Sequence, residues 1–143
     1  MAREPNSWYD SARTSHPISV AGKTIRGPSG PTQHKEVSMT TVIVSPGICG
    51  FTSTITATVD EMYNVAITVD SPCPKIQELA GQITQISAFD EIRKPITDSA
   101  VYQAAAASKC HTACPIPSAV IKAIEVAAGL ALPKDVSFTI SND

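Results

Sequence analysis

Residues 52–70 read TSTITATVDEMYNVAITVD, and this stretch decides the fold. Each half alternates apolar residues with other residues, and a period of two places every second side chain on the same face of a strand. The alternating apolar positions are Ile55, Ala57, Val59, Val65, Ile67 and Val69. Residues 60–62, Asp-Glu-Met, separate the halves and suit a turn. The stretch therefore predicts an antiparallel hairpin of two half-buried strands.

A short apolar run precedes this hairpin. Residues 41–44 read TVIV and are followed by Pro46 and Gly47, which is typical of a buried strand that ends at a turn. We therefore expect a meander of three antiparallel strands.

Three helical patterns follow the hairpin. Pro74 starts the first, whose apolar residues recur at helical spacing through Ile83 and Ile86. Thr97 or Asp98 is expected to cap the second, an alanine-rich helix that ends at residues 109–110. Pro117 and Ser118 open the third, which Pro133 stops.

Residues 136–140 alternate Val, Phe and Ile with Ser and Thr, which predicts a last strand. The expected order is β-β-β-α-α-α-β. It predicts an α+β fold with a three-stranded antiparallel meander, three helices on one face and a C-terminal strand.

The first 38 residues differ from the rest of the chain. They contain prolines at positions 5, 17, 28 and 31 and show no sustained hydrophobic period. We therefore expect residues 1–38 to be a flexible N-terminal extension, and residues 39–143 to form a single α+β domain.

Charge and hydropathy exclude several partners. The chain of 143 residues has a formal net charge of -2, and its Lys and Arg residues are scattered, so nucleic acid is not an expected partner. No apolar stretch is long enough to cross a bilayer, and the N-terminus lacks the features of a secretion signal. We expect a cytoplasmic protein with reduced thiols, and a protein partner or homo-oligomer is compatible with the alanine-rich helices.

All four cysteines are expected in turns rich in proline and glycine. Cys49 lies in PGICG (residues 46–50), Cys73 in SPCP (71–74), and Cys110 and Cys114 in CHTACPIP (110–117). Hairpin connections reverse the strand direction, so Cys49 and Cys73 should lie at the same end of the sheet. A helix leading away and a second helix returning would bring Cys110 and Cys114 to that end. The topology therefore predicts one shared thiol site.

The local sequence predicts that this site favours thiolates. Cys73 precedes Pro74 and Cys114 lies just before Pro117, so both are expected at helix N-termini. The unpaired amides and the positive dipole end found there lower the pKa of a thiol.

The four cysteines are the expected ligands of a metal or cluster. His111 would complete the site if only three of them bind, or would act beside it as a proton donor or a hydrogen-bond donor to sulfur. The spacing is not the paired C-x2-C of zinc ribbons, and the Cys-Gly and Cys-Pro contexts favour an iron–sulfur cluster over zinc. Four thiolates leave no open position, so electron transfer or partner assembly is expected rather than catalysis.

Two other functions stay open at this point. One is thiol redox or sulfur-carrier chemistry by Cys110 and Cys114. The other is an interaction module that either holds structural zinc or holds no metal, and without metal the four thiols are unconnected. The acid pairs Asp60-Glu61 and Asp90-Glu91 are interpreted as surface residues at a turn and a helix end.

Several of these motifs carry a resemblance. They are Cys49-Gly50-Phe51, Ser71-Pro72-Cys73-Pro74, the pair Cys110 and Cys114, and the helical residues 121–133 (IKAIEVAAGLALP). With them, residues 39–143 resemble small uncharacterised four-cysteine proteins of anaerobic bacteria and archaea. The resemblance implies an anoxic cytoplasm, and it carries neither an activity nor a catalytic residue.

Overall fold

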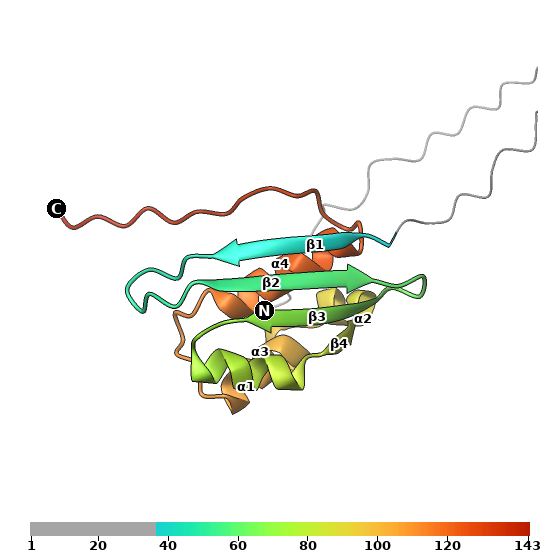
Figure 1. The fold of residues 1–143 in the computed structure, drawn as a ribbon, viewed down its shortest axis with the longest axis horizontal. Coiled ribbons are helices and arrows are strands. Elements are labelled where there is room, and N and C mark those ends of the chain that lie inside the picture. The colour runs from blue at the N-terminus through green and yellow to red at the C-terminus, as the bar shows by residue number, and fades with distance from the viewer. Residues whose placement is uncertain (1–36) are drawn as a thin grey trace, which may run out of the picture. The chain divides into compact units, whose positions relative to one another are not determined.

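A computed structural model describes residues 37–143 (Figure 1). Nearly all of the predicted extension over residues 1–38 lies outside the described residues. The described part contains one four-stranded antiparallel sheet, with β1 (Met39–Val44), β2 (Ser53–Val59), β3 (Asn64–Asp70) and β4 (Gln85–Ser87) in that spatial order. It is an α+β fold, as the sequence predicts.

The predicted hairpin is β2 and β3, with Val59 opposite Val65. Its turn is built by Asp60, whose carboxylate accepts hydrogen bonds from the amides of Met62 and Asn64, both at 2.8 Å. The alternating residues Ile55, Ala57, Val59, Val65 and Ile67 are buried on one face. The period of two therefore predicted both the strands and the face that forms the core.

The helices cover that face, and they are α1 (Pro74–Gln82), α2 (Ala88–Arg93), α3 (Ala100–Ala107) and α4 (Ile116–Ala127), with a 3-10 turn at Ile96–Asp98. Helix α4 packs on β1 and β2, α1 packs on β3 and α3, and α3 packs on α4 (Figure 1). None of the helices described is long and apolar enough to cross a membrane.

Two predictions near the sheet edges, one of a buried strand and one of a helix, are corrected. Residues 41–44 do not form a buried strand, because β1 is an edge strand and the Ile43 side chain is 70% exposed. The first predicted helix also ends early, at Gln82. Ile83 remains in the core, but Ile86 pairs opposite Val65 in β4. The spacing of Ile83 and Ile86 fits a helix, yet this β-branched segment completes the sheet beside β3.

The predicted C-terminal strand is wrong for the single chain. Residues 132–143 contain no helix or strand, and the Val136, Phe138 and Ile140 side chains are 64%, 80% and 90% exposed. The alternating pattern is present, but the described chain pairs no strand with it. The observed order is thus three strands, a helix, the short β4 and three more helices.

The second predicted helix has a different cap from the one expected. Ser99, not Thr97 or Asp98, is the N-cap of α3, and its hydroxyl accepts a hydrogen bond from the Tyr102 amide at 3.2 Å. Beside it, Glu91 is only 3% exposed, so the interpretation of this acid as a surface residue is also wrong. The Glu91 carboxylate accepts hydrogen bonds from Ser99 and from the first amides of α3.

Candidate metal centre

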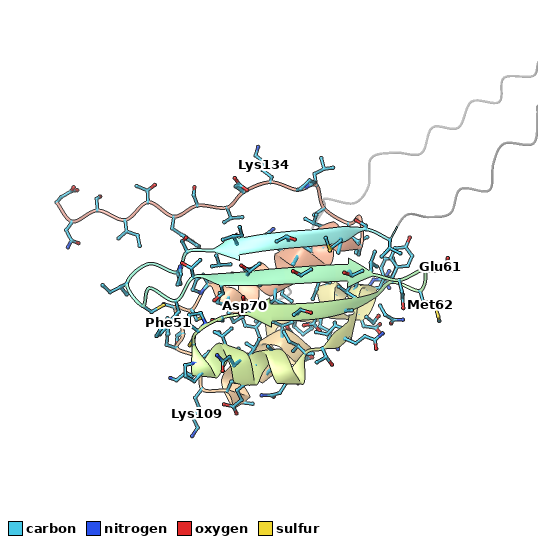
Figure 2. The ribbon with its side chains drawn as sticks, in the orientation of Figure 1. Phe51, Glu61, Met62, Asp70, Lys109 and Lys134 are labelled. Atoms are coloured by element: carbon cyan, nitrogen blue, oxygen red, sulfur yellow. The ribbon has the colours of Figure 1, made fainter. Side chains whose placement is uncertain are left out.

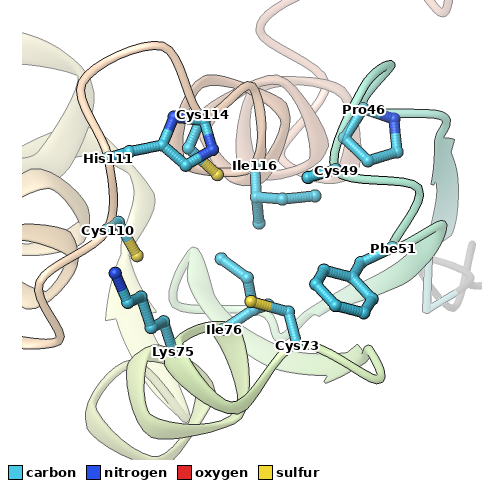
Figure 3. Close-up of a pocket in the computed structure, with 10 residues that line it drawn as sticks. All are labelled: Pro46, Cys49, Phe51, Cys73, Lys75, Ile76, Cys110, His111, Cys114 and Ile116. Carbon is cyan, nitrogen blue, oxygen red and sulfur yellow. The ribbon is translucent and has the colours of Figure 1, made fainter.

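The four cysteines line one pocket of about 180 Å³ at the end of the sheet that carries Phe51 (Figures 2 and 3). The turn with Glu61 and Met62 lies at the opposite end (Figure 2). Apolar side chains form much of the remaining wall, and they are Pro46, Phe51, Ile76 and Ile116. Lys75 and His111 also line the pocket. The structure therefore brings together the cysteines of three separate segments.

Cys49 is held by a tight turn after β1. The Gly50 amide donates to the Gly47 carbonyl at 2.9 Å, and both glycines have positive φ angles of 70° and 82°. Such angles favour glycine, because a Cβ atom clashes with the backbone there. The two glycines that flank Cys49 thus set the path of this loop, and the Cys49 side chain is exposed.

Cys73 is the N-cap of α1, and Pro74 is the first helical residue, as predicted. Its amide donates to the Ser71 hydroxyl at 3.2 Å, and the buried Ser53 hydroxyl donates to the same Ser71 oxygen at 2.7 Å. The Gln77 side chain donates to the Ser71 carbonyl at 2.9 Å. This network ties the Cys73 loop to β2 and α1. It was not predicted, although the sequence carries a signal for it in the pair of serines at matching strand ends.

Cys110 is placed by the C-terminal end of α3. Its amide donates to the Ala105 carbonyl at 2.9 Å, and the Lys109 amide donates to the Ala106 carbonyl at 3.1 Å. These are the two bonds of a Schellman motif, in which the residue after the cap adopts a left-handed conformation. Here that residue is Lys109, with φ 54°, where glycine is usual. Its side chain points to solvent (Figure 2).

The left-handed backbone at Lys109 leads to a stability prediction. We expect Lys109→Gly to raise the free energy of unfolding by about 0.5–1 kcal/mol, because glycine removes the Cβ clash. The shift is measured by urea denaturation. Lys109→Ala removes the same charge but keeps the Cβ, so it should give no such gain. Equal stability of the two variants would contradict the assignment of strain to Lys109.

Cys114 closes a turn before α4. Its amide donates to the His111 carbonyl at 3.0 Å, and its sulfur accepts a hydrogen bond from the Ile116 backbone at the start of the helix. The helix begins one residue earlier than predicted, at Ile116, with Pro117 next to it. The expected amide at the helix N-terminus is therefore present.

The predicted lowering of the Cys114 pKa is nevertheless wrong. Burial raises the pKa of Cys114 and outweighs the Ile116 hydrogen bond, which lowers it. Burial also raises the pKa of Cys110, with Cys114 and Cys73 adding to the shift and Lys75 opposing it. Desolvation has the larger effect on the pKa, because moving a thiolate out of water costs more free energy than one amide hydrogen bond recovers. Both thiols are therefore protonated at neutral pH when no metal is bound.

Sulfur atoms of Cys73, Cys110 and Cys114 point into the pocket (Figure 3). Among residues 37–143, however, no three Cys, His, Asp or Glu side chains lie together as the ligands of one metal ion. A single zinc ion holds sulfur at about 2.3 Å, which requires sulfurs roughly 4 Å apart. The cysteines line a pocket of about 180 Å³. A water-sized group needs about 10–15 Å³ of such volume, so the pocket has room for a group of several atoms.

Lys75 is a pocket residue that the sequence analysis did not single out. It lies in the first turn of α1, and its ammonium group extends toward Cys110 (Figure 3). A cation at this place offsets part of the negative charge that deprotonated thiols would create. The signal in the sequence was its position two residues after Cys73, which places both residues at the same end of α1.

Comparisons with known proteins give a family. No curated protein and no solved structure matches the chain. Residues 40–140 match a family of unknown function, DUF6951, over most of the chain and all four cysteines. The chain therefore belongs to the DUF6951 family.

Proposed function

We propose that this chain is a small iron–sulfur protein, with Cys49, Cys73, Cys110 and Cys114 as the cluster ligands, that serves electron transfer or the assembly of a partner protein. The observation that carries the proposal is that all four cysteines line one pocket although they come from three separate segments. The chain has four cysteines in total. Four cysteine ligands are the usual set for clusters of two or four irons.

The volume of the pocket, about 180 Å³, favours a cluster over a single ion. The described thiols are not arranged around one metal position. A cluster spreads its ligands over several iron atoms, so its sulfurs can lie farther apart than those around one zinc ion. The apolar walls formed by Ile76, Ile116 and Phe51 suit such a group, because they limit its contact with water.

The raised pKa values weigh against the thiol-redox alternative. A reactive cysteine needs a thiolate near neutral pH. Burial raises the pKa of both Cys110 and Cys114, so neither is activated as an attacking thiol. Metal binding displaces thiol protons directly and does not depend on a low pKa beforehand. Ligation is therefore the use that fits these two thiols better.

The surroundings of the site suggest how it would serve a partner. When bound, a cluster accepts and donates single electrons. Cys49 and the fully exposed Ile48 lie on the same loop, and Phe51 follows at the pocket wall with 41% of its surface exposed. A partner could therefore approach the site over a short distance and bury apolar surface there. An anoxic cytoplasm, which the resemblance implies, would protect a centre this close to solvent.

Metal analysis after anaerobic purification tests the proposal. We expect a coloured protein with iron and sulfide in equal amounts, and each Cys→Ser variant should lose most of the iron. Ile48→Ser, next to Cys49 and fully exposed, should retain it. One zinc per chain without sulfide would replace the proposal by a structural zinc site. A folded, metal-free protein that tolerates all four substitutions would leave an interaction module.

A further inference from the structure

We propose that the C-terminal segment, residues 134–141, forms a strand on β1 of a second copy of this chain, so that two copies exchange strands reciprocally. The inference does not depend on the proposed cluster. It rests on two features of the described residues: a strand-patterned segment that has no partner, and an edge strand that has no protection.

The C-terminal segment has the pattern of a strand with one apolar face. Val136, Phe138 and Ile140 would lie on one side, and the alternating residues are Ser and Thr. All three apolar side chains are largely exposed in the single chain. No backbone hydrogen bond is formed by residues 132–143 in the structure described here. The family match nevertheless continues to residue 140, so this segment is part of the family's domain.

Strand β1 is an edge without the usual protection. Edge strands normally carry charged residues, proline or a bulge, or are very short, because an open edge can pair with another chain. The sequence of β1, MTTVIV, contains no charge and no proline, and its six residues pair in continuous register with β2. The opposite edge, β4, is protected by its length of three residues. Within residues 37–143, β1 is therefore the edge that is left open.

The hydrophobic core is also incompletely covered at this edge. Val42 and Val44 of β1 pack against the core but are only half-buried. A strand beside β1 that turned Val136, Phe138 and Ile140 to the helix face would cover these valines and continue the apolar layer. In this arrangement the apolar side chains of the added strand would pack on those of β1. Its Ser and Thr residues would lie on the opposite, threonine-rich face of the sheet.

The surface that would be buried favours reciprocal exchange between two copies. One buried phenylalanine removes about 150–250 Å² from water, so the two Phe138 rings alone would bury about 300–500 Å². With both copies of Val136 and Ile140, the interface would reach the roughly 1,000 Å² that a specific complex needs. Each chain offers one unpaired segment and one unpaired edge, and a two-fold axis satisfies both at once. In the single chain, β1 pairs with β2 alone among the described residues, and the C-terminal segment forms no strand beside it.

Light scattering on the full chain tests this proposal. We expect a mass of twice the chain's 15.0 kDa over a range of micromolar concentrations. Phe138→Asp should halve the mass, since it places a charge in the apolar layer. Thr139→Asp, on the other face of the strand, should leave the dimer intact. Far-UV circular dichroism checks that both variants are folded.

A chain that ends at Pro133 is the second test, because it removes the strand without altering β1 or the core. It should be a folded monomer. A monomeric full chain would overturn the proposal, since the segment would then be free or would pair with its own β1. A dimer that persists in both Phe138→Asp and the shortened chain would overturn it as well.

Discussion

Replacing Glu91 by alanine is expected to lower the free energy of unfolding by about 2–4 kcal/mol, because it leaves buried donors without an acceptor. The carboxylate is buried and accepts hydrogen bonds from the Ser99 hydroxyl and from the amides of Ala100 and Val101, the latter two at 3.0 and 3.1 Å. Alanine would leave these buried donors without an acceptor and remove a negative charge from the N-terminus of α3. The whole stability of a domain is about 5–15 kcal/mol, so the loss would be severe.

Two variants separate this role of Glu91 from a general effect of charge. Asp90→Ala removes the exposed neighbour of the same acid pair and should change the stability by less than about 0.5 kcal/mol. Glu91→Gln keeps the shape, but its NH2 group would face donors on one side, so an intermediate loss is expected. Lys94 lies 3.9 Å from the carboxylate and is 41% exposed, so this ion pair adds little. Urea denaturation that ranks Glu91→Ala equal to Asp90→Ala would contradict the capping role.

The buried Glu91 also affects the candidate site through α3. Helix α3 begins with amides that donate to the Glu91 carboxylate, and it ends at the turn that carries Cys110. Near that end, the buried Ser108 hydroxyl accepts a hydrogen bond from the Gln82 side chain of α1 at 3.0 Å. Because Cys73 is the N-cap of α1 and Cys110 follows the end of α3, packed helices that are anchored at both ends link these two cysteines. Loss of the Glu91 contacts should therefore loosen the pocket as well as the core.

The sequence predicted those parts of the fold in which a local pattern and the tertiary structure agree. The β2–β3 hairpin and the Pro74 start of α1 are confirmed. The segment with Ile83 and Ile86 failed because the same spacing fits a helix face and a strand beside β3. Residues 136–140 failed for another reason, because a strand needs a partner and the single chain supplies none. A period of two predicts that a segment can be a strand, not where it pairs.

The cysteines were placed by topology and not by spacing. Strand and helix directions alone predicted that Cys49, Cys73, Cys110 and Cys114 share one end of the sheet, and the structure places all four around one pocket there. The electrostatics could not be predicted in the same way. Whether burial or a helix N-terminus determines the pKa of Cys114 depends on how deeply the sulfur lies. That depth is set by Ile116 and other residues from several segments, so no local motif reports it.

In the metal-free protein, Cys110 and Cys114 are expected to be alkylated slowly at pH 7, with a rate that rises about tenfold per pH unit toward their pKa. Burial raises the pKa of both thiols above the ordinary value of 9.0, and only the thiolate reacts. Cys49 is exposed and serves as an internal reference for the reagent. Mass spectrometry of the labelled peptides from pH 7 to pH 10 measures each rate. Fast labelling of Cys110 or Cys114 at pH 7 would support the thiol-redox alternative.

The same shifts fix the sign of the pH dependence of stability. A thiol with a raised pKa in the folded state holds its proton more tightly there than in the unfolded state. The contribution of the thiol to the free energy of unfolding is therefore fully present below pH 9.0 and is lost as the pH rises through the folded-state pKa. In the iron-loaded protein the stability should instead rise with pH, because ligation replaces the thiol protons. Alkylation of Cys110 and Cys114 in the loaded protein should then stay slow at every pH, and loaded protein that is labelled as fast as the metal-free form would contradict their role as ligands.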